Sequence, residues 1–259
     1  MPRALVTGGA KRIGRAIALD LAQQGYDVAV HYGTSSDDAE EVADLIRNMG
    51  RKAAAVQADL AVEADMTALI PAAAEALGGP LDCLVNNAST FEYDQIDTAT
   101  RETWDQHMEC NLRAPFVLSQ QFAAQCPEPT QDDQGEPVAA GTIINLIDQR
   151  VRKLTPEFMT YTLSRAALWT MTQTTAQALA PKIRVNAIGP GPTLRGGRQD
   201  EEQFTRQRAA TILRRGSNPE DICQAVRYLL NARGVTGQLI CVDGGQHLSW
   251  ETPDVAGLE

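Results

Sequence analysis

Residues 7–14 read TGGAKRIG, and they decide the fold because they join a short apolar strand at 3–7 to a helical pattern at 13–25. Gly8, Gly9 and Gly14 permit a tight turn and a close approach of the backbone to a ligand. The helix N-terminus that follows offers unpaired N–H groups and the positive end of a helix dipole to an anion. The stretch therefore predicts a loop that holds the pyrophosphate of a dinucleotide.

Beyond this loop, strand-like and helix-like segments alternate along the chain. Short apolar runs typical of buried parallel strands are separated by stretches whose apolar residues recur at helical spacing. The alternation predicts an α/β fold with a Rossmann-type, doubly wound parallel sheet in a single domain over residues 1–259. The expected strands are 3–7, 27–32, 52–60, 81–85, 141–147, 183–188 and 237–243, and the expected helices are 13–25, 37–50, 63–77, 101–124, 157–180 and one that begins at Asn218 and Pro219.

Two segments interrupt this alternation. Residues 125–141 are rich in Pro, Asp and Gln, which is typical of an exposed loop between a helix and a strand. Residues 190–215 begin with a turn rich in Gly and Pro and continue into a charged run, a composition typical of a movable substrate lid. We expect the first segment to be a surface connection and the second to cover a binding site.

The charge balance disfavours several classes of partner. The chain has 23 Lys and Arg against 33 Asp and Glu, a formal charge of -10, whereas affinity for nucleic acids and anionic membranes depends on clustered Lys and Arg. No stretch is apolar enough to span a bilayer, and the opening residues lack the pattern of a secretory signal. We expect a cytoplasmic protein that binds neither nucleic acid nor membrane, so any anion site must be local.

The five cysteines and three histidines show no spacing typical of metal ligands. The cysteines are scattered, with no CxxC pair, and their number is odd. We therefore expect buried, reduced thiols and no metal site.

The end of the second expected strand indicates which dinucleotide is bound. Selectivity for NAD usually comes from an acidic residue at this position, which accepts from the ribose hydroxyls. Here the chain continues HYGTSS at 31–36, and no carboxylate follows until Asp37. Charge-assisted hydrogen bonds to a 2′-phosphate are expected instead, so the sequence predicts NADP(H). The expected donors are Lys11, Arg12, His31 and Ser35.

Ordered motifs along nearly the whole chain resemble those of the short-chain dehydrogenase/reductase family. They are TGGAKRIG, ADL at 58–60, NNA at 86–88, Asn111, the segment around Tyr161, GPGPT at 189–193 and VDGG at 242–245. In that family the aspartate equivalent to Asp59 holds the adenine, and the NNA segment lines the cofactor. The cofactor residues that the resemblance implies are Gly8, Lys11, Arg12, Ile13, Gly14, His31, Tyr32, Ser35, Asp59, Leu60, Asn87, Ala88, Pro190, Gly191 and Thr193.

The resemblance implies a catalytic set of Asn111, Asp148, Tyr161 and Arg165, with two departures from the usual family pattern. Most members carry serine where Asp148 stands, and a carboxylate there is the pattern of the pteridine reductase branch. A lysine usually stands at the position of Arg165. Arginine at i+4 from Tyr161 shares its helix face and carries the same charge, but its guanidinium is larger and does not give up a proton.

Further positions resemble the pteridine reductase branch, including its dihydrofolate and dihydromonapterin reductases. Phe91 matches an aromatic ring that stacks on the flat pterin, Ser89 would be a hydrogen-bond partner, and Arg12 would reach both the cofactor phosphate and the pterin. Thr193 and Leu194 would face the ligand. The substrate residues that the resemblance implies are Arg12, Ser89, Phe91, Asp148, Tyr161 and Leu194.

Three functions remain open. The favoured one is an NADPH-dependent reductase of a pterin or dihydrofolate C=N bond, in which Tyr161 donates a proton and Asp148 positions the substrate. The second is a carbonyl reductase of the same family. The third is an NADPH-binding protein without turnover. It remains open because position 165 is an arginine where the family usually has a lysine. The resemblance also implies a homotetramer formed by 101–124, 157–180 and 219–243.

Overall fold

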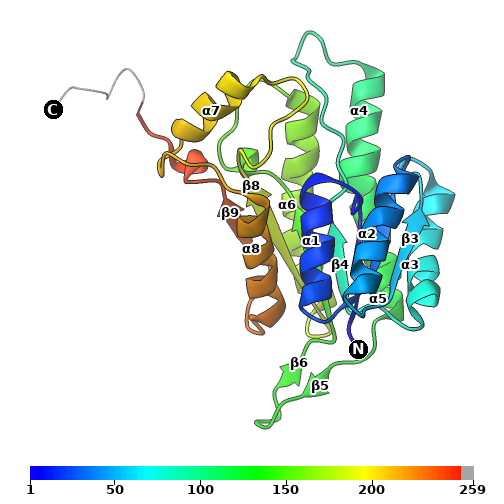
Figure 1. Cartoon of the computed structure of the whole chain (residues 1–259). Coiled ribbons are helices and arrows are strands. Elements are labelled where there is room, and N and C mark those ends of the chain that lie inside the picture. Colours follow the sequence, from blue (N-terminus) through cyan, green and yellow to red (C-terminus); the bar gives the residue numbers. More distant parts are fainter. Residues whose placement is uncertain (252–259) are drawn as a thin grey trace.

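A seven-stranded parallel sheet forms the centre of the molecule in a computed structural model, which describes residues 1–251 (Figure 1). Its strands are β1 (Arg3–Val6), β2 (Asp27–Tyr32), β3 (Ala53–Gln57), β4 (Cys83–Asn86), β7 (Gly141–Leu146), β8 (Ile183–Pro190) and β9 (Leu239–Val242). They are ordered β3-β2-β1-β4-β7-β8-β9, and every neighbouring pair is parallel. The predicted Rossmann-type fold in one domain is confirmed.

Helices cover both faces of this sheet because alternate strand residues point to opposite sides. Ala4 and Val6 pack on one side with α1 (Arg12–Gln23), α2 (Ser36–Asn48) and α8 (Pro219–Asn231). Leu5, between them, packs on the other side with α3 (Glu63–Leu77) and α5 (Ala114–Gln125). The long helix α6 (Met159–Leu179) adds Leu168 and Met171 against Ala187 of β8. The core is therefore two apolar layers with the sheet between them.

The helix expected over 101–124 is present but is not regular. It consists of α4 (Arg101–Met108), a π-helical turn η1 (Glu109–Arg113) and α5. A π turn is wider than an α turn and is frequently found at functional sites. Asn111, one of the residues expected in catalysis, lies in this turn and is fully buried.

The expected loop at 125–141 also contains structure. It forms a small antiparallel hairpin of β5 (Thr130–Gln131) and β6 (Pro137–Val138). The Asp132 carboxylate accepts from the backbone N–H of Gln134 and Glu136 and so holds the turn. The hairpin extends beyond the end of the sheet that is opposite to α7 (Glu201–Ala209) (Figure 1).

The carboxyl ends of the strands meet at one edge, where α7 and the expected lid segment lie (Figure 1). The chain runs from β1 outward to β2 and β3, and then from β4 outward to β7, β8 and β9. Ligands of open α/β sheets bind where this direction reverses, which here is between β1 and β4. Within residues 1–251, no helix combines the length and the apolar character that a membrane span requires.

Candidate active site

The glycine loop after β1 packs tightly against the start of α1. A Cβ at Gly14 would lie 2.1 Å from the carbonyl oxygen of Gly8, so only glycine allows this approach. Gly8 itself has φ +60°, a conformation that glycine adopts without strain. No side chain caps α1, whose N-cap is Lys11, and its first turn has no acidic residue. Its N-terminal N–H groups and dipole are therefore suited to an anion, as the sequence predicted.

His31 lies beneath this loop and not at the surface. It is 2% exposed, its Nδ1 accepts from the N–H of Gly8 at 3.0 Å, and its Nε2 donates to the carbonyl oxygen of Ala58 at 3.1 Å. Burial lowers the pKa of the ring, which keeps it neutral. The prediction that His31 contacts a 2′-phosphate is wrong, because both ring nitrogens are used to hold the loop against β2 and β3.

The other expected phosphate ligands lie near the surface. Lys11 pairs with Asp38 at 2.9 Å, and Ser35 is the N-cap of α2 without a side-chain capping bond. Arg12 has φ 54° and directs its guanidinium to the carbonyl oxygens of Leu194 and Arg195, at 3.2 and 3.0 Å. Arg12 therefore connects the glycine loop to the lid segment.

The remaining cofactor residues predicted from the sequence lie at or near the carboxyl ends of the strands. Asn87 donates from Nδ2 to the carbonyl oxygens of Thr7 and Gly8, at 2.8 and 3.2 Å, and thereby joins the ends of β4 and β1. The Asp59 carboxylate is exposed beyond β3 and accepts from the N–H of Ala61. The others are the half-buried Ile13, Tyr32, Ala88, Pro190 and Gly191 and the buried Leu60.

Tyr161 and Asp148 form a direct hydrogen bond at the centre of the site. The Tyr161 hydroxyl donates to Oδ2 of Asp148 at 3.1 Å, while Oδ1 accepts from the N–H of Arg150 at 2.7 Å. Asp148 follows β7 and caps the short helix η2 (Gln149–Val151), whereas Tyr161 lies in the first turn of α6. The tertiary structure thus joins two residues that the sequence separates by thirteen positions.

Arg165 is buried next to this pair. Arg165 is 2% exposed, and its Cζ lies 5.2 Å from the centre of the Tyr161 ring. Among the described residues, its Nε and Nη1 have no hydrogen-bond partner. Buried donors without acceptors cost free energy, so this guanidinium is suited to acceptors that a ligand supplies.

Burial controls the protonation of both acidic groups. It raises the pKa of the Tyr161 phenol, the nearby Asp148 charge raises it further, and Arg165 acts in the opposite direction. Burial also raises the pKa of the Asp148 carboxyl, against the hydrogen bond from the N–H of Arg150. Tyr161 is therefore protonated at neutral pH and can act as a proton donor.

Asn111 connects the loop after β4 to α6. Its Oδ1 accepts from the N–H of Thr90 at 2.9 Å, and its Nδ2 donates to the carbonyl oxygen of Thr90 at 3.0 Å and to Oγ of Ser164 at 3.2 Å. The π turn brings this side chain to both segments. Asn111 thus positions the loop that carries Ser89 and Phe91.

A second buried polar group holds the same loop, and sequence reasoning missed it. His107 accepts from the N–H of Glu92 through Nε2 at 3.0 Å, and its Nδ1 lies 2.7 Å from Oγ1 of Thr160. Thr160 in turn donates to the Asp94 carboxylate from both its N–H and its hydroxyl. Burial lowers the pKa of His107, which is consistent with a neutral ring.

Phe91 forms one wall of the site within an aromatic cluster. Its ring is parallel to that of Phe158, with centres 4.4 Å apart, and lies edge-on to Tyr161 at 4.6 Å. Phe91 is 41% exposed, and Ser89 beside it is exposed as well, its hydroxyl donating to the carbonyl oxygen of Thr90. Phe158 was not expected here; it precedes α6 with φ 55°, and no sequence pattern indicates that conformation for an aromatic residue.

The lid segment closes over this wall. Arg198, also missed by sequence reasoning, pairs with Glu92 at 2.8 Å and donates to the carbonyl oxygen of Phe91. Thr193 is 5% exposed, and its hydroxyl bonds to the carbonyl oxygen of Gly191 and to Oγ of Ser217. The Thr193 hydroxyl is thus used within the base of the lid, and the prediction that Thr193 faces the ligand stays a prediction. Leu194 is half-buried, and its carbonyl oxygen binds Arg12.

Within residues 1–251, one group of potential metal ligands occurs outside the site. Asp20, Glu220 and Cys223 bring three ligand atoms together between α1 and α8. The guanidinium of Arg227 donates to both carboxylates. A cation of the protein itself therefore offsets part of their charge.

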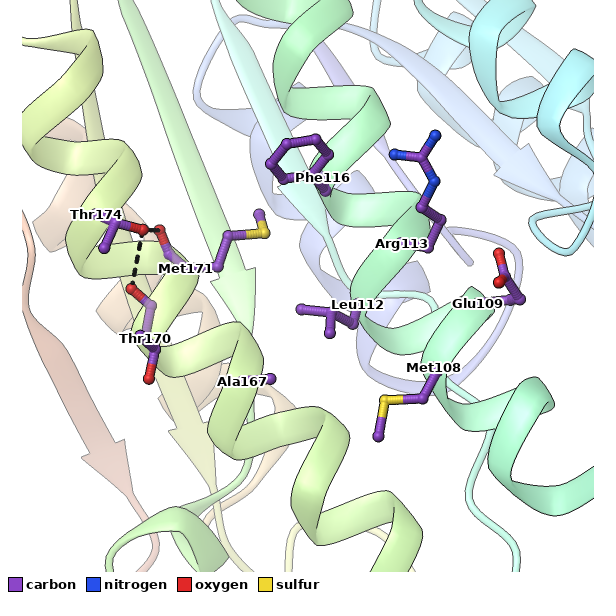
Figure 2. Close-up of a pocket in the computed structure, with 9 residues that line it drawn as sticks. All are labelled: Met108, Glu109, Leu112, Arg113, Phe116, Ala167, Thr170, Met171 and Thr174. Carbon is purple, nitrogen blue, oxygen red and sulfur yellow. Dashed lines mark hydrogen bonds between the residues drawn. The ribbon is translucent and has the colours of Figure 1, made fainter. Parts of the chain in front are cut away.

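A groove of about 480 Å³ lies outside the site, between η1, α5 and α6. Figure 2 shows Met108, Leu112 and Phe116 on one side and Ala167 and Met171 on the other. Its lining is mainly apolar. None of the expected catalytic residues lines it, so the groove is not the reaction site.

Known proteins are similar to this chain in sequence and in fold. A family model described as enoyl-(acyl carrier protein) reductase matches residues 8–247. A short-chain type dehydrogenase/reductase of Picea abies is 31% identical and covers 94% of this chain and 91% of its own. The crystal structure of FolM alternative dihydrofolate reductase 1 from Brucella suis in complex with NADP is 47% identical, covers 98% of both chains and has a TM-score of 0.91.

A ketoreductase is also similar. The structure of the angucycline C-6 ketoreductase LanV with bound NADP is 33% identical over 96% of both chains, with a TM-score of 0.86. Relatives with different substrates thus share the fold, and these two solved structures hold the dinucleotide that the sequence predicted here. The chain belongs to the short-chain dehydrogenase/reductase family of oxidoreductases.

Proposed function

We propose that this protein is an NADPH-dependent reductase of a pterin or dihydrofolate-type C=N bond. The observation that carries the proposal is the hydrogen bond from Tyr161 to Asp148 next to the exposed ring of Phe91. A proton donor, a carboxylate that can bind the polar edge of a heterocycle, and a ring that can stack on it lie together. The similarity to a dihydrofolate reductase of Brucella suis supports the same substrate class.

The residues present fit a bound NADPH. The uncapped start of α1 is suited to its pyrophosphate, and the unpaired donors of Arg165 are suited to the hydroxyls of its nicotinamide ribose. Lys11, Arg12 and Ser35 would hold the 2′-phosphate. When bound, NADPH supplies hydride to the carbon of the C=N bond.

Residues of the chain supply the proton and orient the substrate. Tyr161, kept protonated by burial, donates its proton to the nitrogen of the C=N bond. The Arg165 charge, 5.2 Å from the ring, stabilises the phenolate that remains. Asp148 positions the substrate through its carboxylate, and Phe91 fixes the plane of the heterocycle.

A carbonyl reductase is the second candidate, since the ketoreductase LanV shares the fold. An NADPH-binding protein without turnover is the third, since Arg165 cannot pass a proton onward. The test is NADPH oxidation by the wild type and by Arg165→Lys with dihydrobiopterin, dihydrofolate and a panel of simple ketones. Turnover of the pterins alone supports the proposal. Turnover of ketones alone supports the second candidate, and tight NADPH binding without wild-type turnover supports the third.

We also propose that the protein is a homo-oligomer, and a homotetramer by family resemblance. The apolar groove beside Phe116 and Met171 supports an interface there, because helices that leave such a groove uncovered are suited to packing on another copy. Leu163 on α6 and Trp104 on α4 are exposed as well, at 45% and 43%.

A further inference from the structure

Two arginines border the aromatic wall of the site. The Cζ of Arg198 lies 5.3 Å from the centre of the Phe91 ring and 5.6 Å from that of Phe158, and the Cζ of Arg150 lies 5.1 Å from Phe158. The two rings are parallel with centres 4.4 Å apart. Because Arg198 is nearly equidistant from both, it lies beside the stack and not on the outer face of Phe91. Arg198 therefore does not cover the face of Phe91 that is turned away from Phe158.

These guanidinium groups are available for another anion. Arg198 pairs with Glu92 at 2.8 Å, and both side chains are about half exposed. Exposed ion pairs contribute little to stability, so a competing carboxylate can replace Glu92 at small cost. Arg150 donates from Nη1 to Thr155, while its buried Nε has no partner among the described residues. Two positive groups therefore border this site in a chain whose formal charge is -10.

The chemistry of a reducible dihydrofolate brings its tail to this border. The ring carbon that accepts hydride in 7,8-dihydrofolate also carries the aminobenzoylglutamate substituent. With the nitrogen of the C=N bond at Tyr161 and the ring on Phe91, the substituent on the neighbouring carbon would pass the aromatic wall. Its end carries two carboxylates, and guanidinium groups recognise carboxylates well.

We propose that Arg198 and Arg150 form a carboxylate subsite that makes the enzyme prefer a pterin with an anionic tail over an unconjugated dihydropterin. This inference rests on the proposed pterin reductase function and deepens it. In this structure the Glu92 carboxylate pairs with the Arg198 guanidinium. Glu92 therefore competes with the substrate carboxylate for the N–H donors of Arg198. Arg198 is thus a specificity-determining residue that reaches the substrate from the lid.

The test is steady-state kinetics of the full chain with NADPH and two substrates, dihydrofolate and dihydrobiopterin. The readout is the ratio of kcat/KM for dihydrofolate to kcat/KM for dihydrobiopterin. Arg198→Gln should lower this ratio about tenfold, mainly through KM for dihydrofolate, because a hydrogen bond to a charged group is lost. Glu92→Gln should raise the ratio, because the competing carboxylate is removed. Added salt should raise KM for dihydrofolate more than KM for dihydrobiopterin.

Arg206→Gln is the matched control. Arg206 lies on α7 in the same lid, pairs only loosely with Glu202 at 3.7 Å and is 70% exposed, so its loss should leave the ratio unchanged. A ratio that Arg198→Gln and Arg206→Gln change equally, or that neither changes, overturns the subsite while the proposed function stands. If the wild type reduces neither pterin, the proposed function fails, and the subsite fails with it.

Discussion

At the scale of single residues, Asp148 is a buried carboxyl whose titration affects stability. Burial raises the pKa of its carboxyl above the value of 3.8 expected for the unfolded chain. The folded state then holds the proton more tightly than the unfolded chain does. The free energy of unfolding therefore decreases as pH rises between 3.8 and the raised pKa. At neutral pH the buried charge is therefore a cost.

Asp148→Asn should accordingly raise Tm at neutral pH and lower kcat. The gain in Tm should be about 2–4 °C for each kcal/mol recovered, and the loss in kcat about 10²-fold. Thermal unfolding from pH 4 to 8 measures the first effect, and the difference in Tm between variant and wild type should shrink toward acid pH. A variant less stable than the wild type at neutral pH would show that the charge is not a cost.

The burial of Arg165 leads to a second prediction. Its unpaired donors and its position near Tyr161 predict that it binds the cofactor and stabilises the phenolate. Arg165→Met should weaken NADPH binding about tenfold or more and lower kcat as well. Arg165→Lys keeps the charge and is the control. Fluorescence titration of NADPH measures the affinity, and equal affinities of Met variant and wild type would exclude contact with the cofactor.

At the scale of elements, the start of α6 combines backbone strain with ring stacking. Phe158 adopts φ 55° directly before the helix, and its ring stacks on Phe91. An aromatic residue in this left-handed region is strained, whereas asparagine tolerates it. Phe158 therefore both holds a strained backbone conformation and provides the ring that stacks on Phe91.

Phe158→Asn and Phe158→Leu separate these roles. Both remove the stack, so both should raise KM for the pterin several-fold. Asparagine also relieves about 1 kcal/mol of strain, so this variant should melt roughly 2–4 °C above the leucine variant. Thermal unfolding and KM measure the two effects. Equal Tm values would show that the backbone at 158 is unstrained, and an unchanged KM would show that the stack does not position Phe91.

Element-level reasoning from the sequence succeeded where the determinants are local. The glycine loop, the alternation of strands and helices and the i+4 spacing of Tyr161 and Arg165 are patterns within a few residues. The π turn at Asn111 was not predicted, because its residues read as one continuous helix. The hairpin at 130–138 was missed because its strands have two residues each.

At the scale of the whole molecule, the apolar groove between α5 and α6 leads to a prediction about assembly. Phe116→Glu places a charge in this groove and should reduce the mass in solution below that of the wild type, since an unpaired charge in an apolar interface is costly. Light scattering measures the mass. Ile96→Glu, at a residue 82% exposed outside the groove, is the control and should not change it. A monomeric wild type would contradict the proposal directly.

The sequence by itself determined the Rossmann-type sheet and the glycine loop between its first strand and first helix, because both depend on hydrophobic periodicity and glycine conformations, which are local. Asp148, Tyr161 and Arg165 were predicted from the resemblance to the family, and only the i+4 spacing of Tyr161 and Arg165 is a local pattern. The tertiary structure alone decided that His31 points inward, that Phe158 stacks on Phe91 and that Arg198 reaches them. The contact of Arg198 with Phe91 joins residues 107 positions apart, and such a contact depends on how the lid packs on the rest of the fold.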